Sequence, residues 1–477
     1  MLFTDLVFLL FLPIVFAIYW CLGTKLRWQN LFLLIASYVF YGWWDWRFLL
    51  LIGFTSLCSF FSGKLISKAN SIKRKRFWLW SNVLINLSIL FVYKYFDFFT
   101  QSFSSLLASI GLHADAITLD LILPVGISFY TFQALSYSID IYRGKIPPEN
   151  NTIVFFAFLS FFPQLVAGPI ERATNLLPQF NRARKFDYLR AVSGLRLMLW
   201  GFFKKIVIAD NLAPFVEAVF STYDTQGSLT LFATIIQFSV QIYCDFSGYS
   251  DIAIGTGRLF GIELMRNFNL PYFSRNLSEF WRRWHISLTT WFIDYIYIPL
   301  GGSRKGKSKL IRNTLLVFLI SGIWHGAEWT FLFWGLYHGT ILASSNLLGK
   351  RKRFAEIPGE GRSLPSFNES LIMARTFLIV TIGWILFRAD NLPHAIGYIS
   401  QMFTQWSLHT PIQGKYTFIF ILILFAAEWF SRKRECPLDF KGDGLMAYRI
   451  GRWTVYWLIC VIIILFYKVN TFIYFQF

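Results

Sequence analysis

The stretch that decides the fold class is residues 311–348, IRNTLLVFLISGIWHGAEWTFLFWGLYHGTILASSNLL. It consists mostly of Leu, Ile, Phe, Trp and Gly, and His325 lies near its middle. An apolar helix of about 20 residues spans the roughly 30 Å of a bilayer's hydrocarbon core. An ionisable side chain at that depth is costly, and it is therefore a functional-site hypothesis by default. We predict a membrane protein with a functional histidine at position 325.

The composition extends this prediction to the whole chain. Of its 477 residues, 55% are hydrophobic and 15% are charged, whereas soluble domains carry about 25% charged residues. We predict an all-α polytopic integral membrane protein with roughly ten to twelve transmembrane helices, plus re-entrant and interfacial helices. Residues 1–477 show no repeat and no soluble segment, so we expect one membrane-embedded domain. The candidate spans are 4–21, 29–44, 48–66, 77–95, 152–168, 191–209, 229–247, 311–327, 329–348, 370–388, 416–430 and 452–469.

The formal net charge of +19 raises the question of a nucleic-acid partner. The basic residues cluster in short loops between apolar runs, which is the positive-inside pattern of membrane proteins, so we expect no nucleic acid. We place the loops at 73–76, 304–309 and 350–353 in the cytoplasm and the N-terminus on the opposite side. The cysteines show no disulfide framework and no zinc spacing, and we predict no metal site. They are Cys21, Cys58, Cys244, Cys436 and Cys460.

The placement of these loops bears on His325. Basic loops on one side of the membrane before and after 311–348 require two crossings, so we predict two helices with His325 near the turn. Gly326 would let another backbone or a ligand approach closely. The alternative is a helix-packing histidine bonded to a backbone carbonyl. For His338 we favour a structural role.

A second histidine, His285, lies in the run WRRWHISL at 281–288. We predict one helix over 276–292, in which Trp281, His285, Leu288 and Phe292 share an apolar face. Two interpretations of His285 stay open at this point: a satisfied core histidine of an interfacial helix, or a functional group. The remaining histidines fall in expected loops and are predicted to have no role in chemistry: His113, His394 and His409.

Two further kinds of segment attract notice. Residues 244–262 contain Asp245 and Asp251 among glycines and residues with hydroxyl side chains. We favour a polar network that packs helices; the lining of a substrate path is the second interpretation, and direct catalysis the third. Residues 119–145 and 161–172 contain prolines, which break helices, so we expect re-entrant or interfacial pieces around a pocket. The motifs of serine hydrolases and zinc proteases are absent from the sequence.

Six motifs carry a family resemblance. In chain order they are LPVGISFYTF (123–132), FPQLVAGP (162–169), QIYCDFSGYSDIAIG (241–255), FWRRWHISL (280–288), DYIYIPLGG (294–302) and GIWHGA (322–327). Together they resemble the membrane-bound O-acyltransferases, in the bacterial branch that includes alginate O-acetyltransferase and the D-alanyl transfer protein of teichoic acid. The resemblance is strongest over 120–340. It implies a multi-helix fold around a central cavity open to both membrane faces, a catalytic histidine at His325, and a second polar position at His285.

This resemblance implies transfer of an acyl group, acetyl above others, from a cytoplasmic thioester such as acetyl-CoA. The transfer would cross the bacterial cytoplasmic membrane and serve O-acetylation of an extracytoplasmic polysaccharide such as alginate. His325 would act as general base on a hydroxyl or carry the acyl group briefly, and His285 would orient the acceptor or stabilise an oxyanion. Arg282 and Arg283 are candidates to attract the donor's phosphates, or they determine topology.

We expect the donor to be a substrate, with no permanently bound cofactor. A hydrated polysaccharide would lose the hydration of its hydroxyls in an apolar cavity, so we expect a separate extracytoplasmic protein to accept the acyl group. Peptidoglycan O-acetylation and D-alanyl transfer to teichoic acid stay open. A proton-coupled transporter or flippase also uses intramembrane histidines, but such proteins often contain internal repeats. A non-catalytic assembly subunit would not need both histidines.

Overall fold

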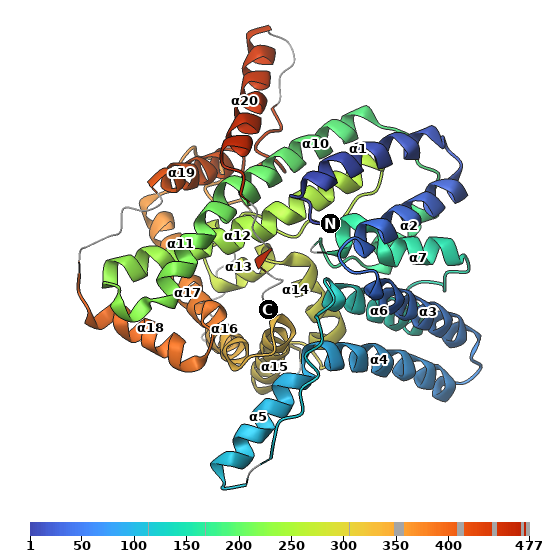
Figure 1. Cartoon of the computed structure of the whole chain (residues 1–477), viewed down its shortest axis with the longest axis horizontal. Helices are drawn as coiled ribbons and strands as arrows, with labels where there is room; N and C mark the ends of the chain where they lie inside the picture. Colours follow the sequence, from blue (N-terminus) through green and yellow to red (C-terminus); the bar gives the residue numbers. More distant parts are fainter. Residues whose placement is uncertain are drawn as a thin grey trace. The chain divides into compact units, whose positions relative to one another are not determined.

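The computed structural model describes residues 1–112, 114–166, 168–304, 306–347, 357–407, 415–440, 446–468 and 472–473. In these ranges the regular structure is helical throughout (Figure 1), which confirms the predicted fold class. The elements are α1 (Leu6–Cys21), α2 (Leu26–Gly42), α3 (Arg47–Lys68), α4 (Ile72–Lys94), α5 (Phe96–Ser109), α6 (Ile127–Tyr142), α7 (Thr152–Ser160), α8 (Phe162–Leu165), α9 (Ala173–Phe180), α10 (Tyr188–Phe202), η1 (Phe203–Ala209), α11 (Asp210–Ser221), η2 (Tyr223–Thr225), α12 (Ser228–Leu259), η3 (Pro271–Phe273), α13 (Leu277–Arg283), α14 (Ile286–Phe292), η4 (Ile293–Tyr297), α15 (Lys307–His325), α16 (Trp329–Leu347), α17 (Phe367–Arg388), α18 (Leu392–Thr404), α19 (Lys415–Phe430) and α20 (Met446–Leu465).

Within the part of the chain that the structure describes, five helices are long and apolar enough to cross a membrane: α3, α4, α12, α17 and the Tyr448–Leu465 part of α20. The shorter helix α1 and the Thr417–Phe430 part of α19 are also apolar. Many side chains of α3 and α4 stay exposed although they are large and hydrophobic, as expected for surfaces that face lipid. The polytopic class is therefore confirmed, and the figure of roughly ten to twelve spans stays a prediction.

The chain divides into two compact units. Unit 1 comprises Met1–Gly194 and Thr256–Met265, and unit 2 comprises Leu195–Gly255 and Arg266–Phe477. The expectation of one functional domain over residues 1–477 stays a prediction. Of the sequence-stretches discussed above, the basic loop at 350–353 lies outside the described residues, as do His113, Lys305 and His409.

In unit 1, helix α6 packs against α3 and α4 and is buried over almost its whole length. The residue before this helix is Gly126, whose φ of 75° lies in the left-handed region that glycine adopts readily, and a side chain there would overlap the carbonyl oxygen of Leu165. The two proline-bearing segments, 119–145 and 161–172, thus meet at this point. Neither segment is among the residues that line the cavity of unit 2 described below, and their expected place around a pocket stays a prediction.

In unit 2, α15 and α16 form an antiparallel helical hairpin and lie side by side (Figure 1). The helices approach closely because two glycines face backbone: a side chain at Gly322 would overlap the carbonyl oxygen of Phe331, and one at Gly335 that of Phe318. Helix α15 ends at His325. The prediction of two helices with His325 beside the turn is confirmed.

Candidate active site

The predicted single helix over 276–292 is wrong, because the chain breaks at His285. Helix α13 ends at Arg283 and α14 begins at Ile286, and His285 between them adopts a left-handed backbone with φ 44°. The cause lies in the preceding segment. The Asn269 N–H donates to the Arg283 carbonyl, and the Ile286 N–H donates to the Asn267 carbonyl, each at 2.9 Å. The Arg283 carbonyl and the Ile286 N–H therefore bond the preceding segment and not the helix partners that a continuous helix would give them.

The His285 side chain is buried, at 1% exposure, and it is held by Asn267. Its Nδ1 lies 3.2 Å from Asn267 Oδ1. The ring packs edge-on against Phe246 at 4.7 Å between centroids and against Trp324 at 5.8 Å. A non-glycine residue in the left-handed region is uncommon, and such strain clusters at functional sites. The strained backbone and the bonded ring of His285 therefore favour a functional role for this residue.

His325 ends α15 with 5% of its side chain exposed. Its ring contacts Trp334 at 5.1 Å and Phe387 at 5.3 Å between centroids. The space beside Gly326, which the sequence left for a ligand or another backbone, is filled by the ring of Phe331. The ring centroids of His285 and His325 lie 6.3 Å apart, although 40 positions separate the two residues in the chain. The structure thus brings the two predicted site residues together.

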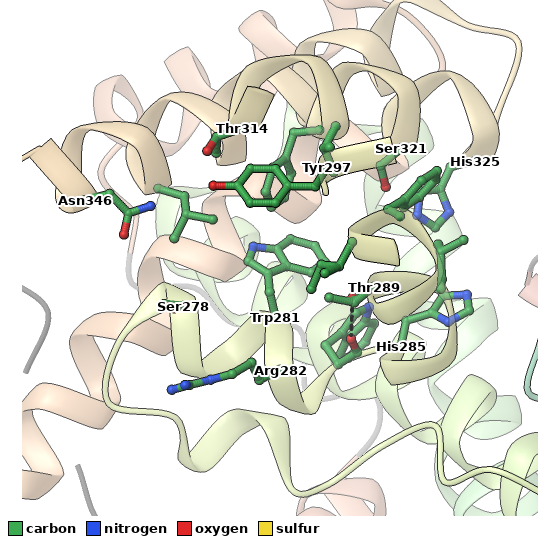
Figure 2. Close-up of a pocket in the computed structure, with 17 residues that line it drawn as sticks. Ser278, Trp281, Arg282, His285, Thr289, Tyr297, Thr314, Ser321, His325 and Asn346 are labelled. Atoms are coloured by element: carbon green, nitrogen blue, oxygen red, sulfur yellow. Dashed lines mark hydrogen bonds between the residues drawn. The ribbon is translucent and has the colours of Figure 1, made fainter. Parts of the chain in front are cut away.

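Both histidines line one cavity of about 230 Å³ in unit 2 (Figure 2). Its walls are largely apolar, with a few hydroxyl and amide groups, as is usual for small-molecule sites. All four residues of the predicted apolar face, Trp281, His285, Leu288 and Phe292, line this cavity, although the helix is broken. The lining residues are Ser278, Trp281, Arg282, Trp284, His285, Leu288, Thr289, Phe292, Ile293, Tyr297, Thr314, Val317, Phe318, Ser321, His325, Leu342 and Asn346.

The two arginines proposed for the donor's phosphates differ in position. Arg282 lines the cavity and is exposed. Arg283 is buried: its Nη2 lies 2.9 Å from Glu279 Oε1, and its Nη1 donates to the Asn269 carbonyl. Arg275 pairs with the same Glu279 carboxylate at 2.8 Å. The Arg283 guanidinium is thus committed to protein groups, which leaves Arg282 better placed for a ligand.

Asp245 and Asp251 belong to a buried polar network, as the sequence favoured, and neither lines the cavity. Their partners are two lysines on the π-helix η1. Lys204 Nζ lies 2.7 Å from Asp251, and Lys205 Nζ lies 2.6 Å from Asp245 and 2.8 Å from Asp210. Sequence reasoning missed both lysines, which it counted inside the apolar run 191–209. The available signal was two adjacent cations within an expected span.

The other described histidines lie outside the cavity lining. His338 is fully buried between the rings of Trp281 and Trp334, at 5.1 and 5.2 Å. His394 lies 3.2 Å from Asp390 and stacks on Tyr223. Among the residues that the structure describes, no group of three or more His, Cys, Asp or Glu side chains is arranged to hold a metal ion.

Comparison with known proteins places this geometry in a family. Residues 147–387 match the model of MBOAT, the membrane-bound O-acyltransferase family. The chain is 42% identical to the probable alginate O-acetylase AlgI of Pseudomonas aeruginosa over 413 residues, covering 86% of this chain and 76% of that protein. It is 37% identical to the peptidoglycan O-acetyltransferase of Helicobacter pylori, covering 84% and 79%.

A third relative is more distant. The chain is 26% identical to the teichoic acid D-alanyltransferase of Bacillus subtilis over 281 residues, covering 57% of this chain and 70% of that protein. The family match includes both histidines and the hairpin that carries His325. The chain therefore belongs to the membrane-bound O-acyltransferase family.

Proposed function

We propose that this membrane O-acyltransferase transfers an acetyl group from a cytoplasmic thioester, acetyl-CoA, towards an extracytoplasmic polysaccharide such as alginate. The observation that carries the proposal is the pairing of His285 and His325 in one largely apolar cavity. Two relatives named as acetyl-transferring proteins cover more than four fifths of the chain, whereas the D-alanyltransferase covers 57%. This difference favours acetyl over D-alanyl.

His325 acts as general base on the acceptor hydroxyl, or carries the acyl group between donor and acceptor. General base catalysis supplies roughly 10²- to 10⁴-fold in rate. Holding donor and acceptor together in a cavity of restricted water supplies much of the rest. His285 positions the acceptor from the other side of the cavity.

Arg282 is the candidate for the donor's phosphates, since its guanidinium is exposed beside the cavity. The protein resides in the bacterial cytoplasmic membrane, with the loops at 73–76 and 304–309 on the cytoplasmic side and the N-terminus outside. The donor then enters from the cytoplasm and the acceptor from the opposite face.

The immediate acceptor is a hydroxyl on a separate extracytoplasmic protein. A cavity of about 230 Å³ accommodates a small group, whereas a polysaccharide would have to shed the water on its hydroxyls without replacement hydrogen bonds. The second candidate acceptor system is peptidoglycan, favoured by the extent of the Helicobacter pylori match. Membership of this family indicates an O-acyltransferase, and it therefore argues against the transporter and assembly-subunit interpretations.

Proteoliposomes test the donor and the acceptor separately. Acetyl-CoA and a D-alanyl-loaded carrier protein are supplied in turn as labelled donors, each together with a serine-containing peptide as the hydroxyl acceptor, and transfer of the label to the peptide is followed. We expect transfer from acetyl-CoA and not from the carrier protein; transfer from the carrier protein only would contradict the proposal. In a second arm, acetyl-CoA is supplied with purified glycan and no other protein. Efficient acetylation of the glycan there would rule out the protein relay.

A further inference from the structure

The orientation of the Asn267 side-chain amide follows from its hydrogen bonds. Asn267 is fully buried in the segment that precedes the broken helix. Its Nδ2 lies 3.2 Å from Ser250 Oγ, and its Oδ1 lies 3.3 Å from the Ser287 backbone N and 2.9 Å from Ser287 Oγ. A backbone N–H donates and never accepts, so the amide atom that faces Ser287 is the oxygen.

This oxygen determines which nitrogen of His285 carries the proton. His285 Nδ1 lies 3.2 Å from Asn267 Oδ1, and an amide oxygen only accepts. Nδ1 therefore donates and holds the hydrogen. A neutral imidazole carries one N–H, so its Nε2 has a lone pair and accepts. The His285 side chain is buried, and the rings packed against it include those of Phe246 and Trp324; such burial favours the neutral imidazole.

We propose that Asn267 is a positioning residue that fixes His285 as the Nδ1–H tautomer, so that Nε2 accepts a hydrogen bond from an N–H or O–H group of the acceptor other than the hydroxyl that reacts, whose proton goes to His325. The inference rests on the proposed acyl transfer and assigns one of the two roles left open for His285. Stabilising an oxyanion requires an N–H at Nε2, which this tautomer lacks. Orienting the acceptor through a neighbouring N–H or O–H group requires the lone pair that this tautomer has.

The Asn267 backbone contributes to the same arrangement. Its carbonyl accepts from the Ile286 N–H at 2.9 Å, in the break where His285 takes its left-handed conformation. One residue thus holds both the backbone and the ring of His285. Partners of this kind fix the tautomer and direction of functional histidines in other proteins, where they bond the ring nitrogen that does not meet the ligand.

A double-mutant cycle separates this role from a general structural one. Acetyl transfer from acetyl-CoA to a serine-containing peptide, which stands in for the acceptor, is measured for Asn267→Ala, His285→Ala and the double variant. Loss of the Asn267 hydrogen bond should lower kcat/KM for the acceptor roughly 5- to 150-fold in the wild-type background. In the His285→Ala background the same change should cost less than about twofold, because the ring that Asn267 positions is gone.

The matched control is Asn86→Ala, which removes a buried asparagine that donates to the Asn82 carbonyl on α4, outside unit 2. It should leave transfer within about twofold of wild type. If Asn267→Ala costs the same factor with and without the His285 ring, Asn267 acts on folding and the proposal is overturned.

A second measurement needs neither a variant of Asn267 nor a working acyl donor. In protein labelled with ¹⁵N-histidine, the His285 resonances are assigned by their loss in His285→Ala. We expect a protonated, pyrrole-type Nδ1 and an unprotonated, pyridine-type Nε2. The reverse assignment would overturn the proposal even if acetyl transfer is found. The expected assignment in a protein that fails to transfer acetyl would instead locate the failure in the proposed function.

Discussion

Replacing Lys205 by methionine should destabilise unit 2 strongly. Lys205 Nζ lies 2.8 Å from Asp210 Oδ1 and 2.6 Å from Asp245 Oδ1, and all three side chains are at most 4% exposed. Removal of the cation leaves two buried carboxylates without the lysine that neutralises them. Breaking one buried ion pair costs about 3–5 kcal/mol. Since 1 kcal/mol shifts the Tm of a domain of 150–250 residues by roughly 2–4 °C, we expect a fall of roughly 6–20 °C.

The assay is size-exclusion chromatography of detergent-purified protein after heating, with the fraction that remains monodisperse as readout. Lys204→Met is the matched control: its partner Asp251 is 20% exposed, so water compensates part of the loss and the Tm should fall less. Adding Asp210→Asn and Asp245→Asn to Lys205→Met should recover part of the stability, because the two buried negative charges are gone. A Tm for Lys205→Met within about 2 °C of wild type would refute the reasoning.

Three further predictions follow from the site and its loops. His285→Asn should keep the Tm within a few degrees of wild type, since asparagine tolerates the left-handed backbone, and should retain more acetyl transfer than His285→Ala; equal activity of the two variants would argue against a polar role. Arg282→Gln should raise KM for acetyl-CoA several-fold with little change in kcat. Arg283→Gln should chiefly lower the Tm, because it removes one of the arginines that pair with Glu279. A lower Tm for Arg282→Gln together with a raised KM for Arg283→Gln would contradict the assignment. A cysteine placed at Gly306, in a background without the native cysteines, should resist an impermeant thiol reagent in intact cells; ready labelling would show that the topology is inverted.

The sequence predicted those parts of the site that depend on local pattern. The hairpin of α15 and α16 follows from basic loops on either side of an apolar run, and both the helix end at His325 and the two-helix arrangement are present. The apolar face of Trp281, His285, Leu288 and Phe292 also survives in the cavity lining. These features rest on periodicity and charge, which a single sequence shows.

The parts that sequence reasoning missed depend on contacts between distant segments. The break at His285 arises because Asn269 bonds a backbone group at the end of α13 and Asn267 bonds one at the start of α14, and the periodicity of the sequence carries no sign of this. Lys204 and Lys205 were absorbed into an apolar run because their carboxylate partners come from other helices. The tautomer of His285 likewise follows only from three-dimensional hydrogen bonding.

The central claim is that His325 performs the chemistry in the cavity it shares with His285. Its most direct test is acetyl transfer from acetyl-CoA by purified His325→Ala in proteoliposomes, with His394→Ala, a histidine outside the cavity, as the matched control. We predict that His325→Ala inserts and melts like wild type and loses transfer by at least about 10²-fold, while His394→Ala keeps it. Near-normal transfer by the His325→Ala protein would contradict the account.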